Sequence, residues 1–92
     1  MTTKQKLSTK TKTTINNAMD QLLLCKGTAK EYQATDKRDN YHFWMREFYS
    51  IILNLNQDYD LLVWVDSIEE AQQSYSHHAK MLKYLRANKV AA

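Results

Sequence analysis

The chain has 92 residues and a formal net charge of +3, and it contains one Gly, no Pro and one Cys. A chain of this length forms one small domain that buries only about 60–65% of the surface its unfolded form exposes, so a second chain would add useful burial. The scarcity of Gly and Pro argues against the tight turns of a β-rich fold and against glycine-rich phosphate loops, and it favours helix.

Several features of the sequence predict a soluble, cytoplasmic protein. Cys25 is the only cysteine and cannot form an internal disulfide, which suits a reducing compartment. The longest apolar run, residues 61–65, is far shorter than the roughly 20 residues that a membrane-spanning helix needs. The first 12 residues are polar and lack the apolar segment of a secretory signal.

Basic residues gather at the two ends of the sequence. The first 12 residues and the last 13 each contain basic residues and no acidic one, whereas the middle of the chain is acidic overall. We interpret residues 1–12 as a flexible Lys/Thr-rich arm and the C-terminal charges as partners of a helix dipole. The alternative is that both ends bind nucleic-acid phosphates. The residues concerned are Lys4, Lys6, Lys10, Lys12, Lys80, Lys83, Arg86 and Lys89.

Apolar spacing predicts a first helix over residues 13–35. Apolar residues recur there at steps of three and four, which places them on one stripe of a helix. This stripe consists of Ile15, Ala18, Leu22, Cys25, Ala29 and Tyr32. Gly27 lies inside the helix and is a candidate position for a bend or an early end.

A second helix is predicted over residues 39–56, and its sequence indicates two distinct faces. One side holds most of the aromatic residues and should lie in the core. It consists of Tyr41, Trp44, Met45, Phe48, Ile51, Ile52 and Leu55. A second strip beside it consists of His42, Arg46, Tyr49 and Leu53. Asp36, Asp39 and Asn40 are candidate N-caps.

The strongest pattern is a heptad repeat, which predicts a third helix over residues 60–88 with Asp58 or Asp60 as its N-cap. The repeat consists of Leu61, Trp64, Ile68, Ala71, Tyr75, His78, Leu82 and Leu85. Such a helix would be the longest of the three, so its end should extend past a small antiparallel three-helix bundle. Because an exposed heptad needs an apolar partner, we expect a homodimer. The predicted dimer seam consists of Tyr75, His78, Leu82 and Leu85.

The sequence contains no persuasive catalytic or metal-binding pattern, so we expect no enzyme activity, no cofactor and no metal. Cys25 lies on an apolar stripe, where a thiol behaves as a small hydrophobic group. His77 and His78 point about 100° apart on a helix and do not favour chelation of one ion. We therefore interpret His78 as an interface histidine.

Two strips of interface-type residues remain as candidate partner-binding surfaces. One strip lies on the predicted third helix and consists of His77, Met81 and Tyr84. The other lies on the second helix and consists of His42, Arg46 and Tyr49. Each strip could instead pack on a neighbouring helix of the same chain.

The leading hypothesis is a small non-catalytic helical interaction protein that binds another macromolecule, with a protein as the expected partner, and acts as an adaptor, inhibitor or assembly subunit. Its small size suits a regulator carried by a phage or plasmid. The first alternative is nucleic-acid binding through the basic arm and the basic helix end. The second alternative is a small-ligand site at a dimer seam near Tyr75 and His78.

Overall fold

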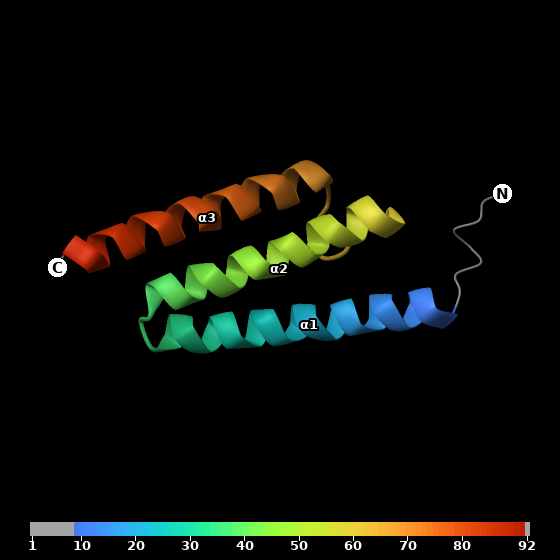
Figure 1. Cartoon of the computed structure of the whole chain (residues 1–92), viewed down its shortest axis with the longest axis horizontal. Helices are drawn as coiled ribbons and strands as arrows, with labels where there is room; N and C mark the ends of the chain where they lie inside the picture. The colour runs from blue at the N-terminus through green and yellow to red at the C-terminus, as the bar shows by residue number, and fades with distance from the viewer. Residues whose placement is uncertain (1–8, 92) are drawn as a thin grey trace.

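The computed structural model describes residues 9–91, with side chains described as far as residue 87. Within that range the chain forms three helices and no strand: α1 (Thr9–Ala34), α2 (Arg38–Tyr59) and α3 (Ile68–Ala91) (Figure 1). The all-α prediction is therefore confirmed.

Several helix boundaries differ from those predicted. α1 begins at Thr9, so residues 9–12 of the predicted arm are helical, and the rest of the arm lies outside the described residues. α1 also continues through Gly27 without ending. α3 begins at Ile68 rather than at residue 60, so the third helix has 24 residues and α1 has 26. The prediction that the third helix is the longest is wrong.

The turn between α1 and α2 is formed by a left-handed residue, Asp36, whose φ is 61°. The Lys37 N–H donates to the Tyr32 carbonyl (2.9 Å), and the Asp36 N–H donates to the Gln33 carbonyl (3.2 Å). These two bonds are the Schellman pattern, which satisfies the last carbonyls of a helix. Asp36 thus ends α1 instead of capping α2, whose N-cap position is Lys37, without a side-chain hydrogen bond.

The segment between α2 and α3 explains why the third helix begins late. Asp60 adopts the left-handed conformation, with φ of 59°, and ends α2 instead of starting a helix. Ser67 is the N-cap of α3, because its Oγ accepts from the Glu70 N–H at 3.2 Å. The Glu70 carboxylate accepts from the Asp66 N–H at 3.0 Å. Ser67 and Glu70 together make a variant of the capping box.

The three helices run alternately up and down, with α2 in the middle (Figure 1). α2 packs against both α1 and α3, whereas α1 and α3 have only marginal contact with each other. The molecule is correspondingly elongated, with extents of 56 × 23 × 19 Å. The C-terminal end of α3 extends past the α1–α2 turn (Figure 1).

The core lies mainly between α1 and α2, on the stripes that apolar spacing predicts. Leu22 and Ile52 are completely buried, and Phe48 and Leu55 of α2 are almost so. α3 contributes Ala71, which is also fully buried. Fully burying a Leu or Ile side chain stabilises a fold by about 1.5–3 kcal/mol, so the packed core between α1 and α2 is the main source of stability.

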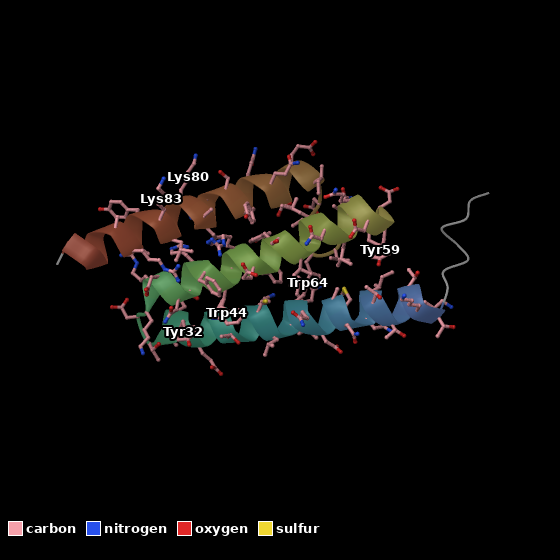
Figure 2. All side chains as sticks on the ribbon, viewed as in Figure 1. Tyr32, Trp44, Tyr59, Trp64, Lys80 and Lys83 are labelled. Carbon is pink, nitrogen blue, oxygen red and sulfur yellow. The ribbon has the colours of Figure 1, made fainter. Side chains whose placement is uncertain are left out.

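Residues 60–67 fold back over the seam between α1 and α2 instead of extending α3. The Trp64 ring stacks on Phe48 with 5.3 Å between ring centroids, and the Lys26 ammonium lies 5.2 Å from the Trp64 centroid. Figure 2 shows Trp64 between α1 and α2. Trp64 has a positive φ of 60°, which is rare for a bulky residue and is tolerated here because the ring packs.

Candidate functional site

The three histidines of the chain meet where α2 packs against α3. His42 lies on the second strip of α2, and that strip faces α3 because the first side of α2 is used by α1. His78 lies opposite on α3, 36 positions later in the sequence, and His77 is its neighbour. The fold thus brings His42 next to two histidines that are far from it in the sequence.

The cluster is compact. The Nδ1 atoms of His42 and His78 are 2.8 Å apart, a hydrogen bond in which one neutral ring donates to the other. Ring centroids are 5.0 Å apart for His42 and His78, 5.0 Å for His77 and His78, and 5.9 Å for His42 and His77. One ring nitrogen from each histidine lies within 4.8 Å of the other two. The exposed fraction is 7% for His42 and 8% for His78, whereas His77 is exposed.

Burial keeps the two inner histidines neutral. Desolvation, with smaller contributions from His42 and His77, lowers the pKa of His78 from 6.5 to about 4. Desolvation also lowers the pKa of His42, and the charges of His77 and Arg38 act in the same direction. Each ring therefore has one nitrogen with a lone pair at neutral pH, and in one of the two rings that lone pair accepts the His42–His78 hydrogen bond.

Two tyrosines hold the orientation of the buried rings. Tyr49 stacks on His78, with 5.8 Å between ring centroids and 13° between the ring planes. Tyr41 packs edge-on against His42 at 5.0 Å and against His78 at 5.9 Å. Packing on several sides limits the rotation of these imidazoles.

A cavity of about 320 Å³ adjoins the cluster at the α1–α2 turn. It is lined by Gln33, Asp36, Arg38, Tyr41 and His42, so it holds one acidic and one basic side chain. A second cavity, of about 290 Å³, lies between α1 and α2 beside Ala18, Ile51 and Tyr59, away from the histidines.

The two predicted partner-binding strips differ in how far their side chains are buried. On α2, His42 is buried against α3, while Arg46 and Tyr49 are half-buried. On α3, His77 is exposed, Met81 is half-buried, and the side chain of Tyr84 is 63% exposed. We call His77, Met81 and Tyr84 the α3 strip.

Two of the four residues of the predicted dimer seam lie inside the chain. His78 and Leu82 are buried, with exposed fractions of 8% and 3%. Tyr75 is 36% exposed and Leu85 is half-buried, so these two are the seam residues that reach the surface. Neither the cavity at the α1–α2 turn nor the cavity between α1 and α2 is lined by Tyr75 or His78, and the small-ligand site near these residues stays a prediction.

The basic residues of the two chain ends lie at opposite ends of the molecule. Lys10 and Lys12 belong to the start of α1, and Lys80, Lys83 and Arg86 belong to the last turns of α3 (Figure 1). Figure 2 shows Lys80 and Lys83 on the outer edge of α3. The predicted contacts Lys4 and Lys6, and the side chain of Lys89, lie outside the described part of the chain.

Cys25 packs in the core with an exposed fraction of 4%. Burial raises the pKa of its thiol, and the charge of Glu47 raises it further. The neutral thiol is a weak nucleophile, so Cys25 contributes packing rather than reactivity.

Comparison of the chain with protein-family models, curated proteins and solved structures found no match. Among the described residues, no helix has the length and apolar character needed to cross a bilayer.

Proposed function

We propose that this chain is a small helical interaction protein that binds a protein partner through the α3 strip and acts as an adaptor, inhibitor or assembly subunit. The observation that carries the proposal is the 63% exposure of Tyr84 on a helix whose end extends past the α1–α2 turn (Figure 1). Tyr gives a large, rigid contact area with a polar end, and it is enriched among residues that dominate binding energy.

The neighbours of Tyr84 support the same surface. Met81 is one turn earlier and half-buried, so a partner would meet a partly apolar strip. Lys80 and Lys83 flank the strip with positive charge, which favours a partner with acidic residues around an apolar centre. A second copy of the chain remains a candidate partner in this proposal.

The test compares two charge-introducing variants of α3 in full-length, affinity-tagged protein, in the cells that naturally express it. Tyr84→Glu places a carboxylate in the strip, and Gln73→Glu places one at another exposed position of α3. After crosslinking, we expect Tyr84→Glu to reduce partner recovery at least about tenfold, because truncating a central aromatic residue costs 2 kcal/mol or more. Gln73→Glu should leave recovery unchanged.

Circular dichroism separates loss of binding from loss of fold, since Tyr84 is exposed and both variants should melt as the wild type does. Equal recovery with Tyr84→Glu and Gln73→Glu would contradict the α3 strip. The absence of any crosslinked partner in those cells would contradict the proposed function itself.

A further inference from the structure

We propose that His42, His77 and His78 bind one divalent transition-metal ion of the Zn²⁺ class, with three imidazole nitrogens supplied by α2 and α3. The inference rests on three side chains whose candidate ligand atoms lie within 4.8 Å of one another. It does not depend on the partner proposed above, because the isolated protein carries all three ligands.

The distances suit a tetrahedral ion after small movements of the rings. Zn–N bonds are about 2.0–2.1 Å, so tetrahedral ligand nitrogens lie about 3.3 Å apart. The Nδ1 atoms of His42 and His78, now 2.8 Å apart, would separate by about 0.5 Å if both bound the ion, and the ring that now donates would carry its proton on Nε2 instead of Nδ1. His77 would move closer, and its exposed ring is able to turn.

The protonation state of the site favours metal binding. Metals bind the lone pair of neutral imidazole, and both buried rings are held neutral by desolvation, which lowers the pKa of His42 and of His78. Tyr49 stacks on His78 and Tyr41 packs against His42, so part of the ordering that an ion requires is already present.

The donor set indicates the class of ion. The cluster contains imidazoles and, among the described residues, no thiolate or carboxylate within the same group. Imidazole suits Zn²⁺, Cu²⁺ and Ni²⁺, whereas Mg²⁺ and Ca²⁺ prefer oxygen ligands. Three protein ligands leave a fourth position for water or another ligand, and the exposure of His77 places one side of the site at solvent.

Two nearby charges tune the affinity in opposite directions. The charge of Arg38 acts on His42 and disfavours a cation there. Asp36 lines the same cavity beside His42 and supplies the opposite charge. On the next turn of α2, Arg46 pairs with Glu47 at 3.4 Å, which offsets its charge.

The experiment titrates Zn²⁺ into untagged, full-length protein freed of metal with EDTA and then dialysed, with isothermal titration calorimetry as the readout. A polyhistidine tag must be absent because it binds the same ions. We expect saturable one-to-one binding of Zn²⁺ and no comparable binding of Mg²⁺. Because the ion joins two helices, the melting temperature should rise by about 10–20 °C when free Zn²⁺ is a hundred times Kd.

Matched variants decide whether the histidines are the ligands. His77→Ala removes an exposed ligand and should fold normally, and Ser76→Ala is the control at the neighbouring exposed position. We expect His77→Ala to weaken Zn²⁺ binding at least about 100-fold, since losing even a group that supports a ligand costs 10–100-fold. Ser76→Ala should bind as the wild type does.

His42→Gln and His78→Gln test the buried ligands, and a measurement on the wild type covers the case in which they fail to fold. Imidazole ¹⁵N resonances of all three histidines should shift on Zn²⁺ addition, and Co²⁺ should give tetrahedral visible absorption. Unshifted resonances, or equal Zn²⁺ affinity of wild type and His77→Ala, would overturn the proposal. Those results would leave the His42–His78 contact as a structural hydrogen bond.

Discussion

At the residue scale, the contact between His42 and His78 is the most unusual feature of the chain. Two buried imidazoles share a hydrogen bond of 2.8 Å, so one must present N–H and the other a lone pair. If both rings were protonated, neither could accept, and two positive charges would meet in a desolvated place. The pair therefore stabilises the fold in its neutral form.

This contact predicts that the metal-free protein loses stability in mild acid. The pKa of His78 is lowered from 6.5 to about 4, so between these pH values the unfolded chain binds a proton that the folded chain does not. Stability from this group is complete above pH 6.5 and is lost as the pH falls towards 4. Urea denaturation in EDTA should show the free energy of unfolding falling by on the order of 2 kcal/mol between pH 7 and pH 5.

The groups that face His78 define the control for that measurement. They are Tyr41, His42 and Tyr49 of α2 and His77 of α3, and Arg38 acts on His42. His78→Gln removes the titrating group, and its stability should change less over the same pH range. If the free energy of unfolding changed equally with pH in the wild type and in His78→Gln, His78 would not be the source of the acid sensitivity.

At the element scale, short-range capping signals decide where the helices begin and end. The sequence Ser67-Ile68-Glu69-Glu70 has the capping-box pattern, which would have placed the start of the third helix at Ile68. The heptad pattern instead predicted a start at residue 60, because Leu61 and Trp64 have the spacing of the repeat. Both residues belong to the segment before α3. Packing of Trp64 on Phe48 is a tertiary contact that no local pattern reports.

Gly27 provides a test of helix continuity. It lies inside α1, and a Cβ atom built on it meets nothing within 4 Å. Gly27→Ala should therefore stabilise the protein by about 0.5–1 kcal/mol, since Ala loses less backbone entropy in a helix. Chemical denaturation gives the measurement, and a loss of stability would mean that α1 needs a bend at this position.

At the scale of the whole molecule, the open arrangement leaves apolar side chains at the surface. α1 and α3 pack on α2 but hardly on each other, so no helix in the described part of the chain covers the outer faces of α1. Leu23 is 58% exposed and Leu24 is 61% exposed on α1, and Tyr84 is 63% exposed on α3. A small domain with this much uncovered apolar surface gains from association.

Light scattering at low and high salt tests that expectation. We predict a mass of twice 10.9 kDa at both salt concentrations, because an apolar contact is not screened by ions. Tyr75→Glu, at the exposed part of the predicted seam, should reduce the mass to 10.9 kDa, while Gln72→Glu should not.

Other results of the same measurement would contradict specific parts of the interpretation. A wild-type mass of 10.9 kDa would contradict the homodimer. A peak with the absorbance of nucleic acid, which high salt removes, would contradict the protein-partner proposal and support phosphate binding by Lys10, Lys12 and the basic residues of α3.

The sequence alone determined the helical class and most of the buried stripes, because a 3.6-residue period reports which side chains share a face. It also indicated that α2 has two distinct faces, but it left open whether the second face meets a partner or another helix of the chain. Only the tertiary structure decided that α3 begins after a folded-back segment and that His42 meets His77 and His78. The physical reason is that helical spacing relates residues within one turn or two, whereas the register between helices depends on their turns and on the whole packed core.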